Sequence, residues 1–136
     1  MKLLLIYANN FGYTPTTKTL EDAEDHTESH DFEKVQTAFI QAEAEDADRE
    51  ADVTKKLVKN LKWIMKKNEA ETLILHSFAH LSESKADPDL TKAIFDKAEE
   101  KMKNAGYTVH QTPFGYFLDL RLDAPGFSLA RVFKDL

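Results

Sequence analysis

The sequence predicts a fold of the α/β class, a mixed β-sheet with two main helices packed on it. Apolar residues recur at helical spacing in two segments, and short apolar runs precede, separate and follow those segments. The last two runs are joined by too few residues for a parallel crossover, so part of the sheet is expected to be antiparallel. With 136 residues and no shift in composition, the chain is expected to form one domain over residues 1–136.

The first third of the chain is predicted to hold three strands and a long loop. Lys2–Ala8 is rich in Leu and Ile and is interpreted as a buried strand. Asn9–Tyr13 mixes turn formers with aromatic residues, which predicts a tight turn into a short second strand. The acidic segment Thr14–Asp31 has no clear period and is expected to be a long surface loop. Glu33–Glu43 alternates loosely between two faces, which indicates the third strand.

The first helix follows a charged connector over Asp46–Glu50 and is predicted over Arg49–Lys67. Acidic residues near its start and lysines at its end suit the helix dipole. Its buried stripe is expected to be Val53, Leu57, Leu61, Ile64 and Met65.

The remaining elements are a strand, a helix and two strands. Thr72–Leu75 is apolar and β-branched, as in a buried strand. Asp87 is an N-cap candidate and Pro88 suits the first turn of the second helix, which is expected to stop at Gly106. Its stripe is Leu90, Ile94, Ala98 and Met102, and the last strands are Tyr107–Thr112 and Phe114–Leu122.

Composition excludes several classes of protein. The net charge of −6 argues against a protein that coats nucleic acid nonspecifically, although one small nucleic-acid end could still be recognised. No apolar run approaches membrane-spanning length and no secretory signal is evident, so no membrane partner is expected. The absence of cysteine excludes disulfides and thiolate chemistry, and a cytoplasmic location is the default expectation.

The segment Thr72–Ser82 is the candidate site, because it changes from apolar to polar at its middle. Its second half, His76–Ser82, holds two histidines and two serines ahead of the second helix. Ligands of open α/β sheets bind outside the carboxyl ends of strands, so His80 and the Ala79 backbone are expected at such an edge. Taken alone, His80 would more often be a hydrogen-bonded structural histidine.

Other features have ordinary interpretations. His26 and His30 are four residues apart, a spacing that binds metal on a helix, but their acidic surroundings favour a solvated loop. Tyr116 and Phe117, taken alone, are strand aromatics that fill a core. Four lysines on one face of the first helix could attract RNA phosphates, although a plain solvated face is favoured: Lys55, Lys59, Lys62 and Lys66.

Two motifs lie about thirty residues apart, Phe78-Ala79-His80-Leu81-Ser82 and Pro113-Phe114-Gly115-Tyr116. Together they make the sequence resemble the N-terminal editing domain of archaeal threonyl-tRNA synthetases. The opening Met1–Tyr7, Ala38-Phe39-Ile40 before Glu43, and the closing Gly126 and Leu129-Ala130 fit the same pattern, so the similarity covers essentially the whole chain in order.

The resemblance implies a D-aminoacyl-tRNA deacylase-like fold, a homodimer, and hydrolysis of serine mistakenly esterified to threonine tRNA. The implied partners are the aminoacylated 3′ end of tRNA(Thr) and a threonyl-tRNA synthetase catalytic subunit. No metal or cofactor is implied, because an activated ester needs only a placed water, donors for the oxyanion and an orienting pocket. His80 would orient the amino acid or the water, and the Ala79 backbone would hold the adenosine. The implied pocket comprises Ala42 in the third strand, Phe78, Ala79, His80, Tyr116 and Phe117.

The chain departs from the family at two positions. Leu118 stands where the family carries a lysine central to catalysis, and Arg131 stands where it carries a glutamate that reaches the pocket. Leucine can neither donate to an oxyanion nor hold a water. Asp119 offers no replacement, because strand alternation directs it to the face opposite Leu118.

Three hypotheses therefore remain. The first is an aminoacyl-tRNA editing hydrolase with altered machinery or an altered substrate. The second is a non-catalytic relative that binds the aminoacylated tRNA end or serves as a dimerisation module. Leu118 and Arg131 separate these two. A flavodoxin-like protein, with a phosphate loop over Tyr7–Thr17, is the third, but it needs a helix directly after the first strand.

Overall fold

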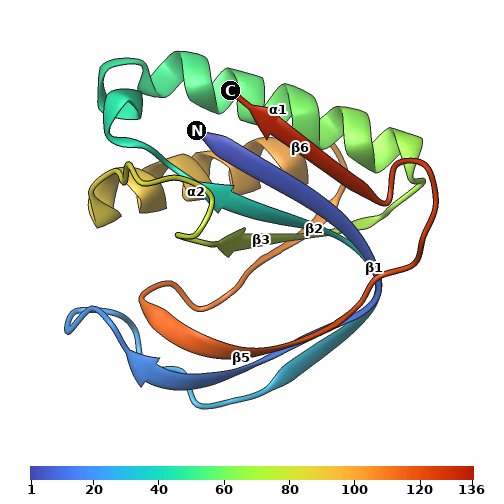
Figure 1. Ribbon diagram of the computed structural model, residues 1–136, viewed down its shortest axis with the longest axis horizontal. Coiled ribbons are helices and arrows are strands. Elements are labelled where there is room, and N and C mark those ends of the chain that lie inside the picture. Colours follow the sequence, from blue (N-terminus) through green and yellow to red (C-terminus); the bar gives the residue numbers. More distant parts are fainter.

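The computed structural model describes all residues, 1–136. The chain forms six strands and two α-helices, as predicted for a mixed α/β fold (Figure 1). In chain order the elements are β1 Lys2–Lys18, β2 His30–Gln41, a 3₁₀-helix Ala44–Asp48, α1 Glu50–Lys67, β3 Thr72–Ser77, α2 Pro88–Asn104, β4 Thr108–Gln111, β5 Tyr116–Asp123 and β6 Arg131–Asp135.

All six strands belong to one mixed sheet, whose order is β4-β3-β2-β1-β5 with β6 also paired to β1. β3 runs parallel to β2 and β4, whereas β2, β5 and β6 are antiparallel to β1. β6 pairs with Lys2–Ile6 and β5 with Asn10–Lys18, so the two strands share one edge of β1. In Figure 1 the two helices cover the half of the sheet around β3, while β5 and the far ends of β1 and β2 curl away from them.

The predicted turn at Asn9–Tyr13 is wrong, because β1 runs without interruption through this segment. Asn10 pairs with Glu33 on one side and Asp123 on the other, and pairing on both edges overrides the local turn preference. Gly12 is required here for space: a Cβ atom would lie 2.0 Å from the Asp31 Oδ1 atom. The glycine thus permits a close approach between strands rather than a turn.

Other boundaries also differ from the predictions. The predicted loop Thr14–Asp31 shrinks to 19–29, because its two ends extend β1 and β2. The connector at Asp46–Glu50 is largely a 3₁₀-helix, and β6 had no predicted counterpart. Asp87 is the N-cap of α2 with Pro88 in the first turn, but its side chain makes no capping hydrogen bond. No helix follows β1, so the flavodoxin-like arrangement is wrong.

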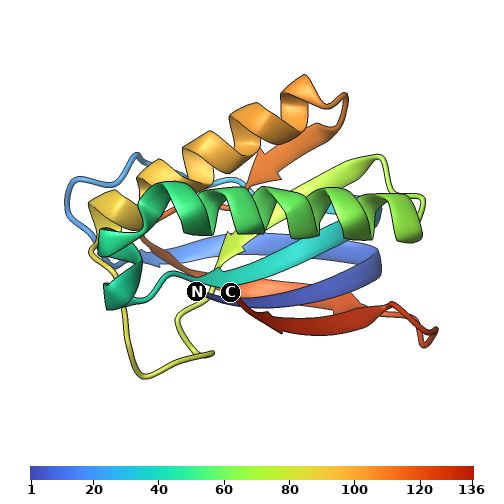
Figure 2. The same cartoon turned by 90° about the horizontal axis from the view of Figure 1, so that it is seen from above.

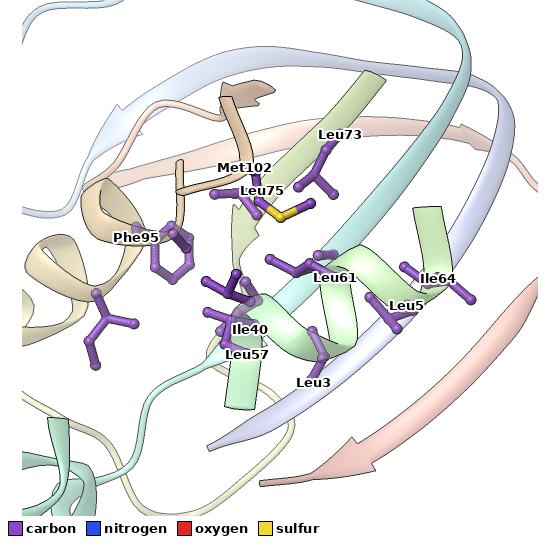
Figure 3. Close-up of a cluster of buried hydrophobic side chains, with 14 of the residues drawn as sticks. Leu3, Leu5, Ile40, Leu57, Leu61, Ile64, Leu73, Leu75, Phe95 and Met102 are labelled. Carbon is purple, nitrogen blue, oxygen red and sulfur yellow. The ribbon is translucent and has the colours of Figure 1, made fainter. Parts of the chain in front are cut away.

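The main core lies between the sheet and both helices. The predicted stripes of α1 and α2 are buried there, except Leu90, which is partly buried. Figure 3 shows Leu57, Leu61 and Ile64 of α1 gathered with Leu3 and Leu5 of β1 and with Phe95 and Met102 of α2. Figure 2 shows the two helices lying side by side over the strands. This packing fixes the carboxyl end of β3, where the candidate site begins.

A second, smaller core covers the opposite face of the sheet and is rich in aromatic rings. Residues of β1 and β2 and Ile74 of β3 belong to it, because successive side chains of a strand point to opposite faces. Phe39 lies at its centre, with the rings of His76 and Phe78 edge-on at 4.8 and 5.0 Å between centroids. This cluster forms one side of the candidate site.

Candidate functional site

A cavity of about 410 Å³ lies between the loop that follows β3 and the segment that enters β5. This volume is within the range of small-ligand sites. The two resemblance motifs, which are far apart in the sequence, therefore meet across one cavity. Of the predicted site residues, the structure brings seven together in its wall: Ala42, Phe78, Ala79, His80, Tyr116, Phe117 and Leu118.

The loop after β3 is held in place chiefly by Gln41, the last residue of β2. The Gln41 Oε1 atom accepts hydrogen bonds from the Leu81 and Ser82 N–H groups at 2.7 and 2.8 Å. Its Nε2 atom donates to the carbonyl oxygens of Ser82 and Ser84 at 2.8 and 2.9 Å. One buried amide thus satisfies four backbone groups of the loop and fixes the position of His80.

Glu43 supports the same loop from beside Gln41. Its Oε2 atom accepts a hydrogen bond from the Ser82 hydroxyl at 2.7 Å, and its Oε1 atom lies 2.8 Å from the Met1 ammonium. Burial opposes ionisation of this carboxyl, but the hydrogen bonds from Met1 and Ser82 prevail and lower the pKa of Glu43 to about 2. Glu43 therefore stays charged at neutral pH and keeps its contact with the loop.

His80 is exposed and makes no hydrogen bond within the chain, so it is not a hydrogen-bonded structural histidine. Its ring lies against Phe78, edge-on, with 5.0 Å between centroids. Phe78 in turn lies on Phe39 of the aromatic core. The imidazole is therefore held at the cavity wall and free to contact a ligand.

His76 is the structural histidine of this segment, and its role was not predicted. Its side chain is buried, and its Nδ1 atom lies 2.9 Å from the Thr112 hydroxyl. Burial among aromatic rings lowers the pKa of His76 to about 4, so the ring is neutral at pH 7. The pair ties the end of β3 to the opposite wall of the cavity.

The opposite wall is formed by the segment that leads into β5. Gly115 adopts a positive φ of 81°, and a Cβ atom there would lie 3.0 Å from Ala23 Cβ, so only glycine fits without strain. The Tyr116 hydroxyl accepts a hydrogen bond from the His26 N–H at 3.0 Å. The 19–29 loop is thereby fastened to the wall, and part of it encloses the cavity.

β5 contributes Tyr116, Phe117, Leu118 and Leu120 to the cavity wall, and Asp119 is not among the lining residues. Leu118 contacts the aromatic core, and Leu120 also lines the cavity, whereas Asp119 is exposed, as expected for the opposite face. Phe117 is 65% exposed. The inner side of β5 therefore presents an apolar floor to the site.

Arg131 does not reach the cavity. It lies on β6, and its Nη1 atom donates a hydrogen bond to the Pro125 carbonyl at 3.1 Å. His26 lies in the 19–29 loop as predicted, but His30 begins β2 and stacks on Phe32. Neither histidine is on a helix, so the helical metal-binding arrangement does not apply.

A larger cavity of about 810 Å³ adjoins the first and shares Leu20, Pro88, Thr112, Pro113 and Phe114 with it. It contains none of His80, Ala79 or Tyr116. Its wall carries four carboxylates against one lysine, Lys92, and this excess of negative charge disfavours an anionic ligand: Asp22, Glu24, Asp87 and Asp89. The smaller cavity is therefore the better candidate for an anionic ligand.

The sheet order and the two helices define the class of protein. The fold is the D-aminoacyl-tRNA deacylase-like α/β fold, in agreement with the prediction. The chain is similar to the solved structure named c-Myc DNA Unwinding Element Binding Protein, with a TM-score of 0.71 and 10% sequence identity. The match covers 100% of this chain and 99% of that one, and at this identity it shows the fold alone.

The chain belongs to the archaea-specific editing domain family of threonyl-tRNA synthetase, whose sequence model matches residues 1–136. Similar proteins include the threonine–tRNA ligases of Thermococcus gammatolerans (32% identical), Thermococcus kodakarensis (31%) and Pyrococcus furiosus (29%). Each alignment covers 100% of this chain but 22% of the relative, so the chain spans about a fifth of their length. Neither helix of the chain is long and apolar enough to cross a membrane.

Proposed function

We propose that this chain edits aminoacyl-tRNA by hydrolysing the ester of serine mischarged on tRNA(Thr), within or alongside a threonyl-tRNA synthetase. The observation that carries the proposal is the meeting of Ala79 and His80 with Tyr116 across one cavity. Membership of the editing-domain family supports it.

The chemistry demanded of such a site is modest. Serine and threonine differ by one methyl group, and the aminoacylation site of a synthetase discriminates between them only weakly. A second site that hydrolyses the wrong product is therefore needed. The ester is already activated, and orienting it beside a water supplies much of the catalysis. In this proposal the exposed His80 imidazole orients the amino acid or the water, while the Ala79 backbone binds the adenosine.

The direct test is incubation of the chain with seryl-tRNA(Thr) and threonyl-tRNA(Thr). We expect ester loss from the seryl form well above buffer, and much slower loss from the threonyl form.

The runner-up function is that of a catalytically impaired relative which binds the aminoacylated end, and the apolar floor at Leu118 favours it. Ester loss no faster than buffer, with retained binding of an adenosine ester analogue, would establish that alternative.

We propose that the lysine face of α1 guides tRNA to the site. Lys55, Lys59, Lys62 and Lys66 are exposed, and the buried stripe of the helix lies on its other side. Charge reversal by Lys59→Glu with Lys62→Glu should weaken tRNA binding at low salt. The slope of log affinity against log salt should fall by about 2, one for each phosphate that a lysine no longer neutralises.

The matched control is charge reversal at Lys97 and Lys101, which are equally exposed but lie on α2. Filter-binding titrations over a salt series measure both variants. Equal weakening in the two pairs would mean that only net charge matters, and unchanged affinity for the α1 pair would reject the proposed surface.

We also propose that the chain is a cytoplasmic homodimer whose further partner is a threonyl-tRNA synthetase catalytic subunit. Large apolar side chains exposed on the surface support self-association, because burying them between two copies of the chain is favourable. Light scattering after gel filtration would report the mass in solution. The exposed residues concerned are Phe117, Leu120, Leu122, Phe127 and Phe133.

A further inference from the structure

We propose that Lys85 is a catalytic residue of this site, with an ammonium group that stabilises the oxyanion formed during ester hydrolysis. The inference rests on the proposed function. It assigns a role to a residue of the loop after β3 that lies outside both resemblance motifs.

Lys85 carries the only formally charged side chain, at neutral pH, among the residues that line the cavity. It forms no ion pair with a carboxylate, whereas several other lysines do, such as Lys18 with Asp25 and Lys56 with Asp52. The positive charge of the cavity is therefore not neutralised by the chain itself. It remains available to a ligand.

The backbone on both sides of Lys85 is fixed. The Ser84 carbonyl accepts a hydrogen bond from Gln41 at 2.9 Å, and the Ser84 hydroxyl accepts one from the Ala44 N–H at 3.0 Å. The Ala86 N–H donates to the Ala42 carbonyl at 3.0 Å. Lys85 thus projects from an anchored stretch, five residues after His80 on the same loop.

Ester hydrolysis creates a negative charge that needs such a group. The water oxygen bonds to the ester carbon and passes one proton to the solvent, and the former carbonyl oxygen becomes an oxyanion. The carbonyl then re-forms as the bond to the ribose oxygen breaks, and the ribose oxygen takes a proton from the solvent. The released carboxylic acid gives its remaining proton to the solvent and leaves as a carboxylate. Phe78 and Leu118 line the same cavity and are only partly exposed, so they limit the water around an oxyanion formed there, and less water strengthens its attraction to an ammonium.

The test replaces Lys85 by methionine, which keeps the unbranched stem and removes the charge. We expect the single-turnover rate of seryl-tRNA(Thr) hydrolysis at saturating chain to fall by roughly 10²-fold, the typical effect of removing one oxyanion donor. Binding of a non-hydrolysable seryl-adenosine amide should change by less than about threefold. Lys85→Arg should keep part of the rate, and Lys101→Met on α2 should keep all of it.

Leu118 offers a rescue, because it lines the same cavity. Leu118→Lys added to Lys85→Met should recover at least about tenfold in rate if a cation at the site is what matters. Lys85 is exposed, so thermal unfolding should be unchanged in each Lys85 variant.

Three results would overturn the assignment. If wild-type chain hydrolyses no ester, the proposed function itself fails and the role of Lys85 fails with it. If wild-type chain is active and Lys85→Met is within twofold of it, only the role of Lys85 is wrong. If Lys85→Met weakens tRNA binding while the saturated rate is unchanged, Lys85 contacts a phosphate rather than the oxyanion.

Discussion

Replacing Gln41 by methionine should lower the hydrolysis rate by about 10²-fold, because the loop that carries His80 loses its main support. Four hydrogen bonds to Leu81, Ser82 and Ser84 disappear together. Displacement of a reactive group by about 1 Å is enough to cost a factor of this size. Hydrogen exchange of the Leu81 and Ser82 amides should accelerate in the variant, since both amides lose their acceptor.

Gln36 is the matched control for this variant. It is also a fully buried glutamine of β2, and its amide bonds the Thr37 carbonyl and Asn68 rather than the site loop. Both substitutions should reduce the free energy of unfolding by about 1–3 kcal/mol, because each leaves buried polar groups unpaired. Only Gln41→Met should abolish most of the hydrolysis. A similar loss of rate in Gln36→Met would show that general instability, and not the loop, is responsible.

Acidification from pH 7 to pH 4 should cost the wild-type chain about 3 kcal/mol of stability that a His76→Asn variant does not lose. His76 has its pKa lowered from 6.5 to about 4 in the folded state, so the unfolded chain takes up a proton first as the pH falls. The contribution of neutral His76 to the free energy of unfolding is complete above pH 6.5, and it is lost progressively as the pH falls from 6.5 to 4. Asparagine is neutral throughout and can still bond the Thr112 hydroxyl.

Urea unfolding at several pH values measures this effect, with the wild-type and variant curves compared at each pH. The smaller asparagine leaves a void whose cost does not depend on pH, so only the difference in slope is diagnostic. Other titrating groups contribute equally to both proteins and cancel. If the free energies of unfolding of the two proteins fall in parallel between pH 7 and pH 4, then His76 takes up its proton as readily in the folded chain as in the unfolded one.

Helical segments and the buried β3 strand were predictable because their signals are local. The stripe Leu57, Leu61 and Ile64 and the Asp87-Pro88 start are readable from spacing alone. The length of β1 could not be predicted, because turn formers such as Asn10 and Gly12 are held extended by strands from elsewhere in the chain. Tertiary pairing decides such segments, and one sequence does not display it.

The candidate site was predictable only where a motif names its residues. His80 and Tyr116 belong to the two motifs, and the structure brings both to one cavity. Gln41 gave no signal, because its function depends on four backbone groups about forty residues further along the chain. Lys85 and His76 lie close to the first motif, but only the fold shows that His76 is buried against Thr112 and that Lys85 lines the cavity.

The most direct measurement is an NMR titration of the isotopically labelled chain with an amide-linked seryl-adenosine, which cannot be hydrolysed. If the cavity between Phe78–Ser82 and Pro113–Leu118 receives the esterified end of tRNA, the largest shifts should appear together in those two segments. Shifts confined to the acidic neighbouring cavity around Asp22 and Asp89, or none at millimolar ligand, would contradict that claim.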